Sequence, residues 1–174
     1  SSSAASDVYK RQGYTDLWFY SHSFLHGPNH PDNPRPDHNK YPKVNSAYMD
    51  LMDYVIDQIF ELNRIRCHCI YRINANSVFP QPTGGILTQP HIDHQFPHKN
   101  MLIYLTDSGG DTICFDNDGK KHHYTPAEDD IVEFQGLHCM QPPKDKRRVV
   151  IVVTYLDEDL EPYQTKWNTD QWRD

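Results

Sequence analysis

The sequence contains no long apolar segment, few cysteines and little glycine. No apolar run approaches the roughly 20 residues that a helix needs to cross a bilayer, which excludes an integral membrane protein with helical spans. The 4 cysteines form no C-x-x-C pair, which excludes a disulfide scaffold and predicts reduced thiols. With 8 glycines in 174 residues, the chain is not collagen-like either.

Positive charge is also scarce, because 17 lysines and arginines stand against 24 acidic residues and leave a net charge of −7. This balance argues against nucleic acid as an obligatory partner. The mean hydropathy is −0.80, yet 12% of the residues are aromatic, which is typical of a folded protein. We expect one domain in the cytoplasm of a bacterium or host cell, because the thiols are predicted to be reduced and no secretory signal is seen.

The chain before residue 45 differs from the rest. Residues 1–12, SSSAASDVYKRQ, resemble the translated end of a sequencing adapter, so we expect a non-native or disordered tail followed by a single domain over 13–174. Residues 14–26 are predicted to form a strand or anchor. Five prolines between 27 and 43 exclude a helix or a central strand and predict a long surface loop.

The remaining chain predicts one helix followed by many strands. The helix is expected over about 45–63, with Asn45 or Ser46 as its cap. Its apolar face repeats at a spacing of three or four residues and contains Tyr48, Leu51, Met52, Val55, Ile56, Ile59 and Phe60. Short strands separated by turn residues are predicted at 67–74, 100–106, 111–116, 120–125, 129–134 and 147–155. The fold class is therefore α+β but mostly β, a sandwich or barrel with the helix packed on one sheet.

A metal-binding pattern lies between these strands. In the H-x-D pair of His91 and Asp93, strand alternation places both side chains on one face. A second imidazole from a distant strand, His138 in Gly-Leu-His, completes three ligands. Two histidines and one carboxylate on one face of an octahedron are typical of Fe(II) oxygenases, with open positions for a chelating co-substrate and O₂.

Seven segments then occur in an order that resembles a known family. They are IYRINAN (70–76), PHID (90–93), LIYLT (102–106), GGDTICF (109–115), DDIVEF (129–134), GLH (136–138) and RRVVIVVTY (147–155). Together they resemble the Fe(II)/2-oxoglutarate-dependent dioxygenases, specifically the prolyl-hydroxylase-like and phage or environmental branch. The resemblance implies a double-stranded β-helix, or jelly-roll, core over about 67–156, with His91, Asp93 and His138 as iron ligands.

The resemblance also implies a site for the far carboxylate of 2-oxoglutarate. Tyr104 matches a tyrosine that hydrogen-bonds this carboxylate, and either Arg147 or Arg148 would form the salt bridge. Strand alternation favours Arg148, because the small residues Val150, Val152 and Thr154 then face inward with it. Arg72, Asn74 and Asn76 share one strand face. They could line the pocket, or equally well form a solvated face.

The other conspicuous side chains receive no role. Cys67, His68 and Cys69 lack a second pair at zinc-site spacing, so a buried structural cysteine is the preferred interpretation. His94 and His98 are expected to be exposed loop histidines. His122 and His123 lie on a hairpin strand, and at most one of them can face a pocket.

The function predicted from the sequence is a non-haem iron oxygenase that couples 2-oxoglutarate decarboxylation to hydroxylation. Its cofactors would be Fe(II), 2-oxoglutarate and O₂, with ascorbate as a further candidate. The substrate, a protein side chain such as proline or a small molecule, depends on the loops 21–43 and 77–90, which match nothing specific. Two alternatives stay open, a catalytically silent β-barrel binding module and a cupin-like metalloenzyme without a co-acid. The oligomeric state is not predicted.

Overall fold

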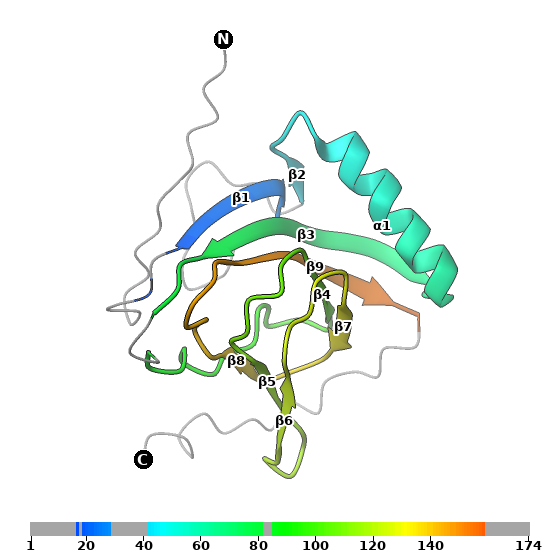
Figure 1. Ribbon diagram of the computed structural model, residues 1–174. Helices are drawn as coiled ribbons and strands as arrows, with labels where there is room; N and C mark the ends of the chain where they lie inside the picture. The colour runs from blue at the N-terminus through cyan, green and yellow to red at the C-terminus, as the bar shows by residue number, and fades with distance from the viewer. Residues whose placement is uncertain (1–16, 18, 29–41, 82–84, 159–174) are drawn as a thin grey trace.

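The computed structural model describes residues 17, 19–28, 42–81 and 85–158 of the chain. These residues form two antiparallel sheets and one helix (Figure 1). The larger sheet has the order β2-β1-β3-β9-β4-β7 and the smaller one β6-β5-β8. The bounds are β1 Phe19–His26, β2 Lys43–Val44, α1 Met49–Asn63, β3 Cys67–Val78, β4 Lys99–Tyr104, β5 Thr112–Phe115, β6 Lys121–Tyr124, β7 Ile131–Phe134, β8 His138–Met140 and β9 Arg148–Asp157. The predicted mostly β class with a helix on one sheet is confirmed.

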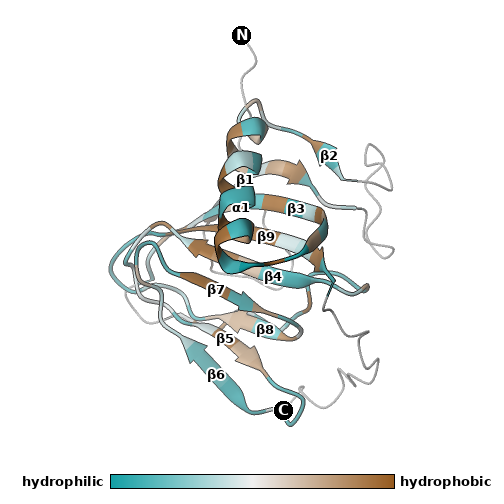
Figure 2. Cartoon of the chain, turned by 90° about the vertical axis from the view of Figure 1, so that its right-hand side faces the viewer, coloured by the Kyte–Doolittle hydropathy of each residue, from teal (hydrophilic) through white to brown (hydrophobic). Residues whose placement is uncertain are grey.

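The helix covers the side of the larger sheet that faces away from the smaller sheet (Figures 1 and 2). Its core face consists of Met49, Met52, Ile56 and Phe60, all of which are buried. They pack against alternate residues of β9, including Tyr155, whose ring centroid lies 4.9 Å from that of Phe60. Each Å² of apolar surface that is removed from water stabilises the fold by about 25 cal/mol. This layer buries the largest of the hydrophobic clusters and is therefore the main hydrophobic core.

The helix begins later than its sequence pattern predicts. A turn occupies the residues that were expected to begin the helix. In this turn the hydroxyl of Ser46 accepts a hydrogen bond from the Tyr48 N–H, and the carbonyl of Ser46 accepts one from the Met49 N–H. Ser46 therefore closes a turn before the helix, and no side chain caps the helix itself. With the core face beginning at Met49, Tyr48 and Leu51 point away from the sheet and are 66% and 58% exposed, so their assignment to the apolar face was wrong.

The inner face of the larger sheet faces the smaller sheet. It carries the residues of β9 that alternate with those under the helix. Val150 and Val152 pack there with Leu102 and Tyr104 of β4, while Ile151 and Val153 belong to the helix layer. The two faces predicted for this strand are confirmed. The inner face carries one part of the candidate site, and the smaller sheet carries the other.

Several predictions fall partly or wholly outside the described residues. The adapter-like residues 1–12 lie outside them, as do residues 29–41 of the proline-rich loop. Residues 19–26 of the predicted strand or anchor form β1, and residues 43 and 44 pair with its end as β2. In the described part of the chain, no helix is long and apolar enough to cross a membrane.

Candidate metal centre

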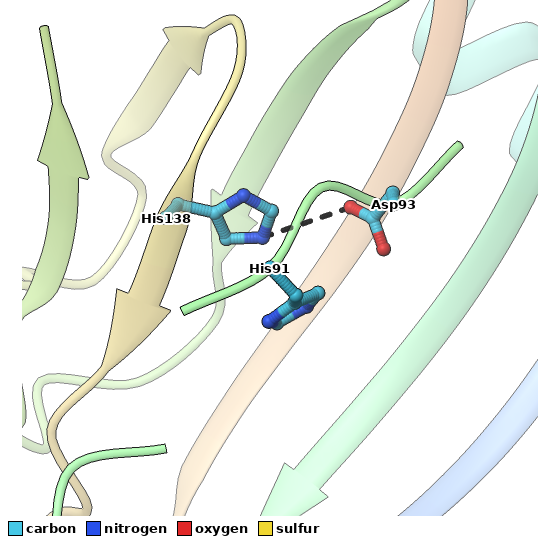
Figure 3. A group of neighbouring side chains, drawn as sticks. All are labelled: His91, Asp93 and His138. Carbon is cyan, nitrogen blue, oxygen red and sulfur yellow. Dashed lines mark ion pairs between the residues drawn. The ribbon is translucent and has the colours of Figure 1, made fainter. Parts of the chain in front are cut away.

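The three predicted metal ligands converge at the junction of β8 and the segment after residue 90. His91 and His138 form an antiparallel bridge, with both backbone N–H groups donating to the partner's carbonyl at 2.9 and 3.0 Å. This bridge places the two imidazoles side by side, with ring centroids 4.5 Å apart. Asp93 extends toward them from the next turn (Figure 3), and the ligand atoms of all three residues lie within 4.8 Å of one another.

Backbone carbonyls hold both imidazoles in a metal-binding tautomer. The Nδ1–H of His91 donates to the Gln89 carbonyl at 3.0 Å, and that of His138 donates to the Gly136 carbonyl at 3.1 Å. Because Nδ1 carries the proton in each ring, Nε2 keeps its lone pair for a metal ion. Burial, opposed by the Asp93 charge, lowers the pKa of His138 to about 4, so its imidazole is neutral at physiological pH.

Asp93 is oriented by Arg72, an arginine for which the sequence left a pocket wall and a solvated strand face equally open. Arg72 Nη2 lies 2.7 Å from Asp93 Oδ1, while Asp93 Oδ2 lies 3.7 Å from His138 Nε2. Burial alone raises the pKa of Asp93, but Arg72 and the two histidines lower it well below its usual range. The carboxylate is thus ionised, with one oxygen bound by Arg72 and the other facing the imidazoles. This two-imidazole, one-carboxylate donor set fits a first-row divalent metal such as Fe(II).

A second polar cluster lies at the other end of β4 and β9. Arg148 is 2% exposed, and its Nη2 donates to Thr112 Oγ1 at 2.7 Å. Thr112 and the Tyr104 hydroxyl are 2.7 Å apart, and Arg148 Nη2 reaches the same hydroxyl at 3.5 Å. Arg148 Nε and Nη1 are buried and have no hydrogen-bond partner in the described structure. A buried arginine with free donors fits an anionic group that is not part of the chain.

Thr112 was not identified from the sequence. Alternation along β5 shows that Thr112 and Cys114 share a face, and Cys114 lies opposite His138. That spacing could have indicated a residue facing the site. It could not indicate contact with Arg148, which lies 36 residues away in the chain.

The remaining predicted pocket residues are Arg147, Asn74 and Asn76. Arg147 is exposed, and its guanidinium carbon lies 4.4 Å from the ring centroid of Phe79. Asn74 and Asn76 lie on the inner face of β3, opposite Val152 and Val150 of β9. Both are only partly exposed, which leaves the pocket and the solvated face open as descriptions of this strand face.

His94 and His98 are not exposed loop histidines, and that expectation was wrong. They are 8% and 0% exposed. The His94 ring stacks on Phe96 with centroids 4.7 Å apart, and its Nε2 lies 2.9 Å from Thr154 Oγ1. The rings of Tyr71 and Phe96 enclose this segment, which has its own small core beside Asp93.

The cysteines and the hairpin histidines agree more closely with expectation. All four cysteines are free thiols, although Cys69 is exposed rather than buried. His122 and His123 are both exposed and contact Asp116 and Asp111 on their own hairpin. Among the described residues, the only His/Cys/Asp/Glu group that could hold a metal consists of His91, Asp93 and His138.

Comparison with known proteins gives a likeness of fold. No family model and no curated protein sequence matches the chain. Among solved structures, a 2OG-Fe(II) oxygenase family oxidoreductase from Burkholderia pseudomallei superposes with a TM-score of 0.62 at 12% identity, over 79% of this chain and 68% of that one. A prolyl hydroxylase from Trichoplax adhaerens, solved with a hypoxia inducible factor peptide fragment, gives a TM-score of 0.51 at 17% identity, over 78% and 71%. The chain therefore has the fold of the 2OG-Fe(II) oxygenases, and the resemblance inferred from its motifs is confirmed at that level.

Proposed function

We propose that this protein is an Fe(II)- and 2-oxoglutarate-dependent oxygenase that hydroxylates its substrate. The observation that carries the proposal is the pairing of a metal-ligand group on the smaller-sheet side with a buried arginine cluster on the inner face of the larger sheet. The group formed by His91, Asp93 and His138 fits the metal, and the buried donors of Arg148 fit the far carboxylate of the co-acid. The apolar side chains of Leu102 and Val150 pack on the same face and suit the methylene groups between them. The proposed core is accordingly a double-stranded β-helix.

In this proposal each residue has a defined part. His91 Nε2, His138 Nε2 and Asp93 would hold Fe(II), and Arg72 would keep Asp93 ionised and oriented. Arg148, rather than Arg147, would bind the co-acid carboxylate with Tyr104 and Thr112, because only Arg148 is buried with free donors. When bound, iron and 2-oxoglutarate supply the oxidation, in which O₂ gives one atom to the substrate C–H bond and one to succinate, with release of CO₂.

The chain itself binds, orients and excludes water. A buried carboxylate without a partner costs several kcal/mol, so the Arg148 cluster selects a co-acid with a second carboxylate. The surrounding buried side chains keep water from the reacting groups. We propose that the substrate is a protein side chain such as proline, or a small molecule. Ascorbate is proposed as an auxiliary reductant, and the proposed location of the protein is the cytoplasm.

The direct test is succinate formation from 2-oxoglutarate with Fe(II) and O₂. His91→Ala, Asp93→Ala and His138→Ala should each abolish Fe(II)-dependent succinate while the circular dichroism spectrum stays that of the wild type, because none of the three side chains belongs to a hydrophobic core cluster. Asp93→Ala also breaks the ion pair with Arg72 and should be the least stable of the three. His122→Ala is the matched control, since this histidine is exposed on β6 and its Nε2 contacts Asp116 of the same hairpin. His94 is unsuitable as a control because it is buried.

Three outcomes would contradict the proposal, and the last two would each favour one of the alternatives. Full turnover in Asp93→Ala would remove the ligand assignment. Metal binding without any 2-oxoglutarate binding would favour the cupin-like metalloenzyme, and binding of neither would favour a silent β-barrel module.

A further inference from the structure

Asn100 is a fully buried amide whose polar atoms have no partner in the described structure. Its side chain is 0% exposed, and neither Nδ2 nor Oδ1 makes a hydrogen bond. An unpaired buried amide costs about 1–3 kcal/mol, and folded proteins rarely leave both ends of one unsatisfied. A group outside the chain is therefore expected to pair with it.

The strand register places Asn100 on the inner face, next to residues that lead to the metal ligands. On one side it lies opposite Phe134 of β7, whose ring centroid is 4.8 Å from that of His138. On the other side it lies opposite Thr154 of β9, which in turn lies opposite Arg72 of β3, the partner of Asp93. Asn100 thus occupies the position between the residue under His138 and the residues that support Asp93.

Two of the neighbouring polar groups are already engaged, whereas Arg72 Nε is, like the Asn100 amide, buried without a hydrogen-bond partner in the described structure. The Thr154 hydroxyl is bound to His94 Nε2 at 2.9 Å, and Arg72 Nη2 is bound to Asp93. The amide of Asn100 is left for a molecule that enters the site. An amide N–H is a neutral donor that pairs well with an anionic oxygen and adds no charge next to a cation.

The Arg148 cluster lies at the other end of the same strand. Asn100 and Tyr104 are four residues apart on β4, about 13 Å along the strand, and Leu102 lies between them on the inner face. A dicarboxylic co-acid that reaches Arg148 with one end would therefore bring its metal-binding end toward Asn100. This step rests on the function proposed above.

We infer that Asn100 Nδ2 donates a hydrogen bond to the oxo-acid end of the co-acid, the end that chelates the metal. Asn100 is then a binding residue for the co-substrate, separate from the Arg148 cluster. Its role divides recognition of 2-oxoglutarate into two ends that can be tested with fragments. Oxalate carries only a chelating end, and glutarate carries the far carboxylate without the oxo-acid.

The test is isothermal titration calorimetry of the full Mn(II)-loaded protein with 2-oxoglutarate, oxalate and glutarate. Asn100→Leu, which keeps the branched shape and the number of side-chain heavy atoms but removes the donors, should weaken 2-oxoglutarate and oxalate by about tenfold to a hundredfold. Its glutarate affinity should stay within twofold of the wild type. Arg148→Met is the matched control and should show the reverse pattern, with glutarate weakened and oxalate retained.

A second variant guards against a folding defect. Asn100→Asp is isosteric, removes the donors and adds a negative charge near the metal. It should bind Mn(II) at least as tightly as the wild type and bind oxalate at least tenfold more weakly, whereas a damaged site would lose both. Unchanged oxalate affinity in both variants would overturn the inference and show that the amide is satisfied by water. Absence of 2-oxoglutarate binding to the wild type would instead overturn the proposed function.

Discussion

Arg72 illustrates how one residue can govern the state of the candidate metal centre. It pairs with Asp93 at 2.7 Å, and their side chains are 17% and 10% exposed. Arg72→Met would leave a mostly buried carboxylate without its partner, so we expect the free energy of unfolding to fall by roughly 3–5 kcal/mol at neutral pH. Urea denaturation of the metal-free protein measures this loss. Addition of Mn(II) should recover part of it, because the cation compensates the same charge.

The pH dependence of that loss follows from the direction of the Asp93 pKa. The pKa of the folded state lies well below the ordinary value of 3.8, so the ion pair stabilises the protein above that value and its contribution is lost as pH falls further. The difference in the free energy of unfolding between the wild type and Arg72→Met should therefore become smaller at acidic pH. Arg66→Met is the control, since Arg66 pairs with Glu158 at an exposed site and should cost no more than about 1 kcal/mol. Equal unfolding midpoints for wild type and Arg72→Met would contradict the role of Arg72.

At the scale of the element, the alternation of β9 separates two adjacent arginines. Arg148 is buried beside Tyr104 and Thr112, whereas Arg147 is exposed on Phe79. Arg148→Met should raise the 2-oxoglutarate Kd by at least tenfold, because truncating one partner of a buried charge pair costs about 2–5 kcal/mol. Arg147→Met should leave it unchanged. Calorimetric titration of the Mn(II)-loaded variants gives both values, and an effect confined to Arg147→Met would reverse the assignment.

A second feature of the larger sheet joins three of its strands. Lys99 of β4 donates to Glu133 of β7 at 2.9 Å and to Asp157 of β9 at 2.7 Å. Burial lowers the pKa of Lys99, but these two carboxylates outweigh it and raise the pKa above 10.5. The ion pairs of Lys99 thus stabilise the fold fully below pH 10.5. This stabilisation is lost as the pH rises through the higher pKa that Lys99 has in the folded protein.

Lys99→Met should therefore cost about 2–3 kcal/mol at neutral pH, as expected when hydrogen bonds to charged groups are lost. The difference from the wild type should shrink when denaturation is repeated at pH above 10.5. Lys121→Met is the comparison variant, because Lys121 is exposed and only approaches the Phe115 ring at 5.8 Å. A cost that stays constant across this pH range would mean that packing, and not charge, accounts for it.

Local pattern predicted most of the elements, because alternation and turn residues are properties of neighbouring positions. His138 was expected on a strand, but the bounds of β8 were not predicted, since three residues are too few to show a period. The helix α1 was predicted to begin too early, because the hydroxyl and carbonyl of Ser46 accept hydrogen bonds within a turn that precedes the helix. The choice of Arg148 followed from alternation alone, since the two β9 faces differ in residue size.

Contacts between distant segments could not be predicted in the same way. The burial of His94 depends on the Tyr71 and Phe96 rings, and the Arg72–Asp93 pair depends on how the segment after residue 90 folds onto β3. Asn100 was passed over because an asparagine in a strand carries no signal until its neighbours across the sheet are known. The metal triad was found because its members are chemically distinctive, not because their separation of 45 residues predicts contact.

At the scale of the whole molecule, the candidate site links both sheets, so its occupation should stabilise the entire fold. His138 lies on the smaller sheet, while Arg148 and Asn100 lie on the larger one. A ligand at a hundred times its Kd that binds only the folded state adds about 2.7 kcal/mol. For a domain of this size that corresponds to a rise in Tm of about 5–10 °C. We expect this rise when Mn(II) and 2-oxoglutarate are added together under nitrogen, as measured by scanning calorimetry.

The variants and a chelator determine where the stabilisation originates. Asp93→Ala should lose the response to Mn(II), and Arg148→Met should keep the response to Mn(II) but lose the additional rise with 2-oxoglutarate. EDTA should return the wild type to its metal-free Tm, because the ion binds the folded state reversibly. A Tm that rises equally in the wild type and in Asp93→Ala would mean that the metal binds elsewhere. A response to 2-oxoglutarate that survives EDTA would separate the co-acid from the metal and contradict a shared site on the inner face.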